Sequence, residues 1–383
     1  MNTAKRNKLL LSLTVVFFWF AQYVYVPFQT PYLNGLGIAA ASVGVILGAY
    51  GFSQTIVRIP VGVLADKRNR HKIFIAAGVL GAGAASLLRY LSPTAGAFLA
   101  ANLISGLASS MWISFTLLYT SFFDPAESKK ALGRITALNN LGILLGFVLG
   151  SVVAETVNVE TLFLMSLGAG VIGFVISLFL KEEKSAPREI PVRELLSALK
   201  NRRLWAFAII AMLMQAISLS TLLSFTSDAA EALGGTNFEI GLCSSIGIVF
   251  SVLSSAFVGT RAAARLGDRR LITGCFALLA IYCALVSLAE SMVALYFLQM
   301  LGGTGTAAIF AVAMSNAIAE IPPEKRSTAM GFHQAIYGLG MTLGPALMGA
   351  VTEGASLMWG FFALAAIALV GLIFTQVVWK RLK

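Results

Sequence analysis

The sequence predicts an all-α membrane protein with twelve transmembrane helices, arranged as two parallel six-helix repeats with both termini in the cytoplasm. Three observations predict this fold class. Of the 383 residues, 58% are hydrophobic and only 12% are charged, whereas soluble domains carry about 25% charged residues. Apolar windows of about twenty residues, long enough to cross a bilayer as a helix, recur throughout the chain. Sequence patterns of the first half return in the second half.

The apolar windows give the predicted helices in order. The first window follows Lys5, Arg6 and Lys8, a charge pattern that signal peptides share. Its apolar run is too long for a cleavable signal, so we expect a spanning helix. The first six predicted helices cover residues 9–32, 43–63, 73–91, 96–121, 131–153 and 160–180. The other six cover residues 204–226, 239–260, 271–289, 292–317, 327–351 and 356–379.

A polar stretch between the sixth and seventh helices divides the chain. The parts are an N-terminal half at 1–180, a linker at 181–203 and a C-terminal half at 204–383. The linker contains an apolar stripe at helical spacing, which predicts an amphipathic helix on the membrane surface. A regulatory docking segment is the alternative. The residues of the stripe are Val192, Leu195, Leu196 and Leu199.

The distribution of basic residues predicts the orientation. All 28 Lys and Arg residues except Arg58 and Arg89 fall at the chain ends or in alternate loops, together with the linker, while the opposite loops carry only acidic residues. Loops rich in Lys and Arg stay in the cytoplasm. We therefore expect a multi-pass protein of the cell membrane, in contact with its lipids, with both ends of the chain inside.

An internal repeat supports the division into halves. A set of small and apolar residues in the fifth helix recurs at one constant offset in the eleventh. Two halves of six helices each enter the membrane from the same side, so the repeat is parallel, and two such halves can rock about a central site. The matching sets are Ala131, Gly133, Ala137, Leu141, Gly142, Leu145 and Gly146, and then Ala329, Gly331, Ala335, Leu339, Gly340, Leu343 and Gly344.

Composition also excludes other classes. The net charge of +11 comes from loops between apolar spans, so it reports topology rather than nucleic-acid binding. Cys243, Cys275 and Cys283 lie inside apolar runs and resemble small hydrophobic residues rather than a disulfide or metal set. With two His residues and no phosphate-cradling loop, the sequence predicts neither an enzyme nor a cofactor.

The loop after the second predicted helix carries a dense polar motif. It matches the pattern G-x-L-A-D-[RK]-x-G-R-[RK], except for Asn69 and His71, and a weaker copy lies around Asp268. The chain thus resembles the major facilitator superfamily along essentially its whole length. The matching residues are Gly62, Leu64, Ala65, Asp66, Lys67 and Arg70.

The resemblance implies a latch that closes the cytoplasmic side. In this family the Asp at the position of Asp66 is thought to meet the start of the eleventh helix and nearby basic groups. A solvated charge run that only fixes topology is the alternative. We expect Arg58 to join the latch or to snorkel, and Arg89 to snorkel. The gating candidates are Gly62, Leu64, Asp66, Lys67, Arg70, Lys72, Arg58, Asp268, Arg269, Gly340, Gly344 and Pro345.

The resemblance also implies that the first, fourth, seventh and tenth helices line a central cavity. Their polar and aromatic side chains would make a neutral, amide-rich lining that suits an amphipathic, uncharged or weakly charged molecule. Packing, or exposure to lipid, is the alternative for each side chain. The substrate-binding candidates are Gln22, Tyr25, Gln29, Asn102, Ser109, Trp112, Thr116, Gln215, Ser218, Gln299, Thr306 and Phe310.

Signals for proton antiport are mixed. The antiporter pattern G-x-x-x-G-P-x-x-G-G is interrupted by Phe147 in the fifth helix and matched more closely in the eleventh. Asn102 stands where related antiporters have Arg in R-x-x-x-G, and the first and fourth helices contain no carboxylate. His333 and Asp228 remain as proton-coupling candidates.

We therefore expect a secondary transporter that works by alternating access and exports small amphipathic organic molecules by proton antiport. An importer or facilitator of a polar metabolite such as a sugar is the first alternative. A membrane sensor that binds ligand without moving it is the second.

Overall fold

The structure, a computed structural model, describes residues 3–68, 70–124, 127–182, 197–322 and 325–381. Within these ranges, the side chains of residues 62–68 lie outside the description. Twelve helical segments in the described ranges are long and apolar enough to cross a membrane. Each coincides with one predicted helix, so the predicted all-α membrane fold with twelve spans is confirmed.

The N-terminal half contains six spans, two of which are interrupted. The first span consists of α1 (Thr3–Tyr23) and α2 (Val26–Gly35), and the fourth of α5 (Ala95–Ser110) and α6 (Trp112–Ser121). The uninterrupted spans are α3 (Ala40–Arg68), α4 (His71–Leu91), α7 (Ser128–Thr156) and α8 (Glu160–Leu178).

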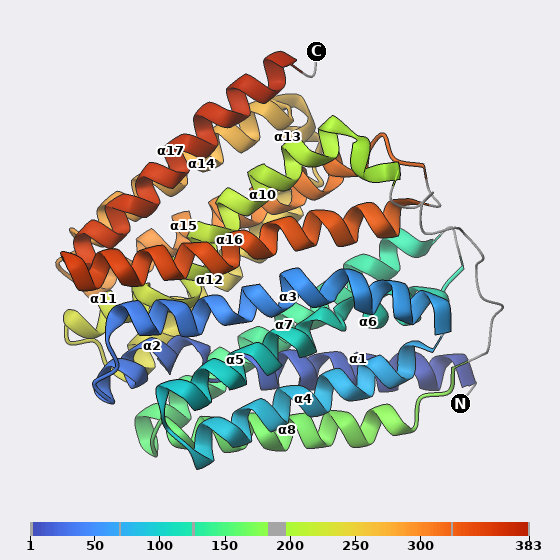
Figure 1. Ribbon diagram of the computed structural model, residues 1–383, viewed down its shortest axis with the longest axis horizontal. Coiled ribbons are helices and arrows are strands. Elements are labelled where there is room, and N and C mark those ends of the chain that lie inside the picture. Colours follow the sequence, from blue (N-terminus) through green and yellow to red (C-terminus); the bar gives the residue numbers. More distant parts are fainter. Residues whose placement is uncertain (1–2, 69, 125–126, 183–196, 323–324, 382–383) are drawn as a thin grey trace.

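The C-terminal half repeats this plan. Its first span consists of α10 (Arg202–Ser220), a π-helical turn η3 (Thr221–Phe225) and α11 (Thr226–Ala232). The other spans are α12 (Asn237–Val258), α14 (Asp268–Val286), α15 (Met292–Ala317), α16 (Arg326–Gly354) and α17 (Leu357–Arg381), with a short α13 (Arg261–Leu266) before α14. Figure 1 shows the N-terminal half in blue and green below the C-terminal half in yellow and red.

Side-chain caps fix several helix starts. Thr94 and Asn201 accept backbone N–H groups in the first turns of α5 and α10. Thr236 and Glu239 form a reciprocal capping box at the start of α12. These groups satisfy amides that no carbonyl of the same helix can reach. The caps explain why α5, α10 and α12 begin where the apolar windows begin.

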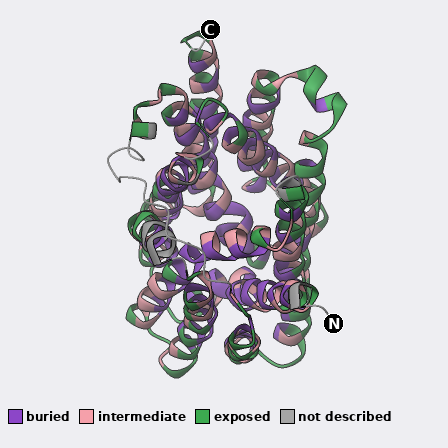
Figure 2. Cartoon of the chain, turned by 90° about the vertical axis from the view of Figure 1, so that its right-hand side faces the viewer, coloured by how far each residue is buried: buried purple, intermediate pink, exposed green. Residues whose placement is uncertain are grey.

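The surface of the bundle is apolar, as a lipid environment requires. Large hydrophobic side chains are exposed on the outer faces of the spans, for example Phe52, Val293 and Phe297. Figure 2, which looks along the bundle, shows buried residues toward its interior and exposed residues around its outside. Exposed apolar surface of this extent is typical of membrane-facing helices.

The halves meet mainly through two helix pairs, α3 with α16 and α7 with α12, and α2 also contacts η3, α11 and α12. Figure 1 shows α3 and α16 side by side along the middle of the molecule. Their close approach depends on glycine, because a side chain at Gly44 would clash with the carbonyl of Pro345 and a Cβ at Gly48 would lie 2.5 Å from the carbonyl oxygen of Thr342. Small residues thus allow the backbones of the two halves to pack in direct contact.

The bundle has two chemically different ends. We name the end that carries Arg70, Lys181 and Arg265 the basic end, and the end that carries Glu155 and Glu353 the acidic end. The predicted amphipathic helix of the linker falls mainly on residues 183–196, outside the described residues. The following residues, Ser197–Lys200, form one 3₁₀ turn.

Candidate functional site

Three spans change their helical geometry inside the membrane. The first span breaks at Val24 and Tyr25, just before Pro27, which cannot donate a backbone hydrogen bond. The fourth span breaks at Met111, and the seventh contains the π turn η3. Interrupted helices and π turns free backbone polar groups and concentrate at functional sites. All three spans were predicted to line the cavity, whereas α15, the tenth span, is continuous.

A buried hydrogen-bond network joins the first, second and fourth spans at the level of these breaks. Gln22 donates through Nε2 to the carbonyl of Ser105 at 2.9 Å and to the Ser109 hydroxyl at 2.8 Å. The hydroxyls of Tyr50 and Ser109 are 2.7 Å apart. Gln22 of the first span and Ser109 of the fourth, both predicted to line the cavity, are therefore hydrogen-bonded to each other.

Arg89 of α4 extends this network with a buried positive charge. Its Nη2 donates to Asn102 Oδ1 at 2.7 Å and to the Ser105 hydroxyl at 3.0 Å, and its Nη1 donates to the Ser86 hydroxyl at 3.2 Å. The guanidinium carbon lies 4.3 Å from the centre of the Tyr25 ring. Such a stack is favourable for a cation that has left water.

The prediction that Arg89 snorkels to the membrane surface is wrong. The residue is fully buried. The reason is its position on the inward stripe of α4, where Ile75, Val79, Ala82 and Ser86 are also buried at helical spacing. No described acidic side chain forms an ion pair with Arg89 under a 4.0 Å limit. A fixed positive charge thus lies among the predicted cavity residues.

Asn102 organises the end of the network nearest the acidic loops. Its Nδ2 donates to the carbonyl of Ile46 at 2.7 Å, and its Oδ1 accepts from Arg89 and, at 3.4 Å, from Gln29 Nε2. One amide therefore connects α2, α3, α4 and α5. The site brings together five of the predicted residues, namely Gln22, Tyr25, Gln29, Asn102 and Ser109.

The two remaining candidates of the N-terminal half lie on α6, between the network and the basic end. Trp112 is half-buried and packs edge-on against Trp19, with ring centroids 5.3 Å apart. Thr116 is half-buried, and its hydroxyl donates to the carbonyl of Ile113 in its own helix. Trp112 therefore belongs to an aromatic cluster that already supports its position.

The candidates of the C-terminal half form no comparable network among the described residues. Gln299 is buried, and its Oε1 has no hydrogen-bond partner there. Thr306 donates to the carbonyls of Gly302 and Gly303 in its own helix. Gln215 and Ser218 are half-buried, and Phe310 packs edge-on against Tyr337. The site is thus built mainly by the N-terminal half.

Arg58 makes a buried polar contact between the halves. Its Nη1 donates to the hydroxyl of Tyr337 at 2.6 Å, and both residues are buried. Arg58 therefore does not snorkel. It ties α3 to α16 in the part of the bundle nearer the basic end.

The other gating candidates have varied surroundings. The side chains of Gly62, Leu64, Asp66 and Lys67 lie outside the description, so the predicted latch at Asp66 stays a prediction. Arg70 is exposed, and Lys72 donates to the carbonyl of Leu178 at 2.6 Å. Asp268 accepts from Asn316 Nδ2 at 2.6 Å, and Arg269 donates to Gln376 Oε1.

The small residues of α16 face two different neighbours. Side chains at Gly340 and Gly344 would clash with the α10 carbonyls of Met212 and Ala216, within the same half. The carbonyl of Pro345 faces Gly44 of α3, across the halves. These positions allow α16 to pack closely against α10 and against α3.

The two proton-coupling candidates lie near contacts between the halves. His333 is fully buried on α16, its ring nitrogens have no hydrogen-bond partner among the described residues, and its ring centroid is 6.1 Å from that of Tyr337. Asp228 of α11 is half-buried and faces Thr30 and Asn34 of α2, in the other half. Protonation of either residue would therefore change the charge close to a contact between the halves.

Sequence reasoning missed Tyr50, Ser105, Arg89 and Tyr337 as members of these contacts. A usable signal existed for Arg89, because an intramembrane Arg in phase with an apolar stripe is a functional candidate by default. Tyr50, Ser105 and Tyr337 carry no such signal, since their partners come from other helices.

Twelve spanning helices in two related halves, two of them broken beside a buried polar network, define the architecture of a multi-pass membrane transporter. The chain belongs to the Major Facilitator Superfamily, because the model of that family matches residues 11–229 and 208–382. It is a multi-pass protein of the cell membrane.

Individual relatives are distant but match nearly the whole chain. Multidrug resistance protein MdtG of Escherichia fergusonii is 22% identical over 392 residues, 99% of this chain and 95% of MdtG. An uncharacterised MFS-type transporter of Methanocaldococcus jannaschii is 24% identical over 91% of this chain and 92% of its own length. The crystal structure of a bacterial homologue of the human lysosomal transporter Spinster, inward-facing and unoccupied, has a TM-score of 0.78 at 12% identity and covers 98% of this chain and 96% of that chain.

Proposed function

We propose that the protein exports small amphipathic organic molecules by alternating access, with protons as the coupling ion. The similarity to MdtG, a multidrug resistance protein by name, supports export of such molecules. The amide, hydroxyl and aromatic groups around Gln22, Ser109 and Trp112 support the same substrate class, because they combine hydrogen-bonding groups with apolar surface.

The observation that carries the proposal is the uneven distribution of hydrogen bonds between the halves. Among the described residues, four such bonds lie at the acidic end and one, between Arg58 and Tyr337, lies toward the basic end. The four bonds join Thr30 to Ser224, Ala41 to Glu353, Asn237 to Ala154, and Phe238 to Glu155, over 2.9–3.2 Å.

Among the described residues, which leave out the side chains of residues 62–68 at the basic end, this asymmetry supports a state with the acidic end closed, and we propose that the basic end is the one that opens. We place the basic end in the cytoplasm, because its loops hold the Lys and Arg residues. An exporter takes up its substrate in such a state. The likeness to the inward-facing Spinster homologue supports the same assignment.

Arg89 narrows the proposed substrate class. A buried guanidinium without an acidic partner creates a positive potential that is weakly screened inside the membrane. It attracts anionic groups and repels cationic ones. We therefore assign neutral and anionic amphipathic molecules to this transporter, and a weaker response to cationic ones.

His333 is the proposed proton carrier at the basic end. The ring of Tyr337 is near both groups, with its centroid 6.1 Å from that of His333 and 5.5 Å from the Arg58 guanidinium carbon. Protonation of His333 would place a second positive charge near Arg58 and thereby weaken the contact of α3 with α16. Asp228 is the corresponding candidate at the acidic end.

Efflux of fluorescent dyes from energised cells tests the proposal. The panel contains neutral, anionic and cationic amphipathic dyes, each measured with and without a protonophore, for the unaltered protein and for Asp66→Asn and His333→Gln. We expect efflux of neutral and anionic dyes that needs the proton gradient and falls in both variants. Absence of efflux for every dye would contradict export. A saturable inward flux of a sugar without a proton requirement would favour the importer.

A further inference from the structure

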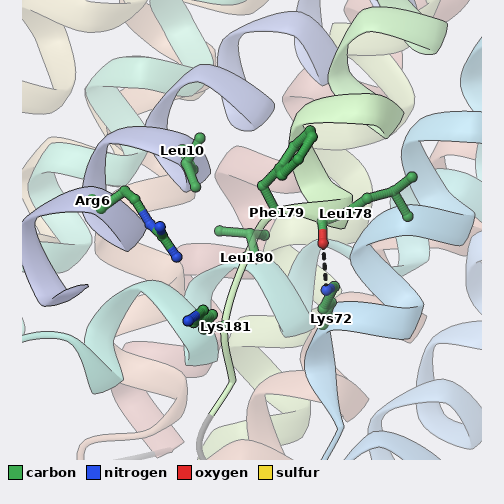
Figure 3. A pocket seen from close by; sticks show the side chains of 7 residues that line it. All are labelled: Arg6, Leu10, Lys72, Leu178, Phe179, Leu180 and Lys181. Carbon is green, nitrogen blue, oxygen red and sulfur yellow. Dashed lines mark hydrogen bonds between the residues drawn. The ribbon is translucent and has the colours of Figure 1, made fainter.

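A cavity opens at the basic end of the N-terminal half, away from the polar network. It measures about 580 Å³ and lies where α1, α4 and the end of α8 meet (Figure 3). Its lining combines three basic side chains with four apolar ones: Arg6, Lys72 and Lys181, and Leu10, Leu178, Phe179 and Leu180. No acidic side chain lines it.

The positive charges of this cavity form no ion pair with the acidic residues that the structure describes. Under a 4.0 Å limit, none of Arg6, Lys72 and Lys181 forms an ion pair with a described acidic residue. The Nε of Arg6 is buried without a hydrogen-bond partner among the described residues. Three like charges around one space repel each other unless an anion occupies it.

Glu182 is the nearest acidic residue in sequence, but its carboxylate is already bound. Oε1 accepts the backbone N–H of His71 at 2.6 Å and Oε2 accepts that of Lys72 at 3.1 Å. Glu182 therefore caps the start of α4, and its single negative charge offsets only one of the three positive charges around the cavity. The basic groups remain available to a ligand.

The walls of the cavity are held in place by neighbouring contacts. Asn7 is buried, donates to the carbonyl of Lys181 at 2.7 Å and accepts the Lys181 N–H at 3.2 Å. Lys72 Nζ donates to the carbonyl of Leu178 at 2.6 Å, the bond drawn in Figure 3. These contacts fix α8 against α1 and α4, so a ligand finds a preformed site.

The apolar side of the cavity continues onto the membrane-facing surface. Leu178 and Phe179 are 50% and 64% exposed, at the end of the last span of this half. The site thus offers cations at the level of the lipid headgroups and apolar surface at the level of the acyl chains. Basic pockets between spanning helices are suited to anionic lipid headgroups.

We propose that this cavity binds the phosphate headgroup of an anionic phospholipid, with Arg6, Lys72 and Lys181 around the phosphate and an acyl chain along Leu178 and Phe179. The bound lipid would bridge the first, third and sixth spans and hold the N-terminal half together as one rigid body. Its role is separate from substrate transport and does not depend on the substrate class proposed above.

Lipid binding to the purified full-length protein tests this proposal. Dissociation constants are measured in detergent by native mass spectrometry for phosphatidylglycerol and phosphatidylcholine, with inorganic phosphate as the soluble competitor. The variants are Arg6→Gln, Lys181→Gln and the double variant. Arg265→Gln, which removes an exposed cation at the same end of the other half, is the matched control.

We expect phosphatidylglycerol to bind more tightly than phosphatidylcholine, and each cation removed from the cavity to weaken binding by roughly fivefold. Arg265→Gln should leave binding unchanged. Equal affinity for the two lipids, or equal loss in Arg265→Gln, would overturn the proposal. Displacement of the lipid by millimolar inorganic phosphate would also overturn it, because the site would then be a free-anion site. If Arg6→Gln fails to fold, the exposed Lys181→Gln alone decides.

Discussion

The hydrogen bond between Arg58 and Tyr337 provides the sharpest test of how the halves separate. The substitution Tyr337→Phe removes one hydroxyl and leaves the ring, so packing against Phe310 and His333 is retained. The lost bond is 2.6 Å long and its donor is charged. Hydrogen bonds to charged groups contribute about 1.5–3 kcal/mol. If the bond forms only when the basic end is closed, its loss destabilises the closed state by this energy. The population of molecules with the basic end open then rises by roughly tenfold or more.

Thiol labelling measures this population directly. The reporter is Thr116→Cys on α6, in a background without the three native cysteines, and a membrane-impermeant maleimide is applied at the basic end. We expect Tyr337→Phe to raise the labelling rate by about tenfold. Arg58→Met should raise it similarly, and the double variant no further, because all three remove the same bond.

A matched control separates this effect from general loosening. Tyr282→Phe also removes a buried tyrosine hydroxyl, which lies 3.0 Å from that of Thr226 within the C-terminal half. It should leave the labelling rate unchanged. Equal labelling in Tyr337→Phe and the unaltered protein, or additive effects of Tyr337→Phe and Arg58→Met, would refute the reasoning.

Three further predictions concern the buried charge of Arg89, the packing of α3 against α16, and the aromatic cluster around Trp112. Arg89→Met should reduce export of anionic dyes by about tenfold or more and that of neutral dyes less, measured in inverted vesicles; equal loss of both would contradict a charge-based role. Gly44→Val should prevent the close approach of α3 to Pro345 and so increase thiol labelling of Thr30→Cys from the acidic end; unchanged labelling would show that this packing does not close that end. Trp112→Ala should weaken dye binding in fluorescence titrations and also lower stability, by about 0.5–1.5 kcal/mol for the lost edge contact with Trp19 in addition to the lost burial of the indole; a loss of stability alone would identify Trp112 as packing.

The twelve spans were predictable because the bilayer imposes a length and an apolar composition on each helix. The helix ends agree closely with the predicted windows, as for Met292–Ala317, which matches residue for residue. The breaks in the first and seventh spans were not predicted. They arise where Pro27 removes a backbone donor and where Thr221–Phe225 widens into a π turn.

The polar network was predictable in part. Helical spacing placed Gln22 and Gln29 on one face and Asn102 and Ser109 on another, and the structure joins these faces. Arg89 was misplaced because its nearness to the helix end suggested snorkelling, whereas its position on the buried stripe decides its direction. Partners such as Tyr337 depend on contacts between distant helices, which no local pattern encodes.

The central claim is that the two ends of the bundle open in alternation. Paired spin labels test it in proteoliposomes, with one pair at Arg70 and Arg265 at the basic end and the other at Leu36 and Ala355 at the acidic end. Distances are measured by double electron–electron resonance at high and low pH. The account predicts that one distance lengthens as the other shortens when the pH changes. Distances that stay fixed, or that change in the same direction, would contradict it.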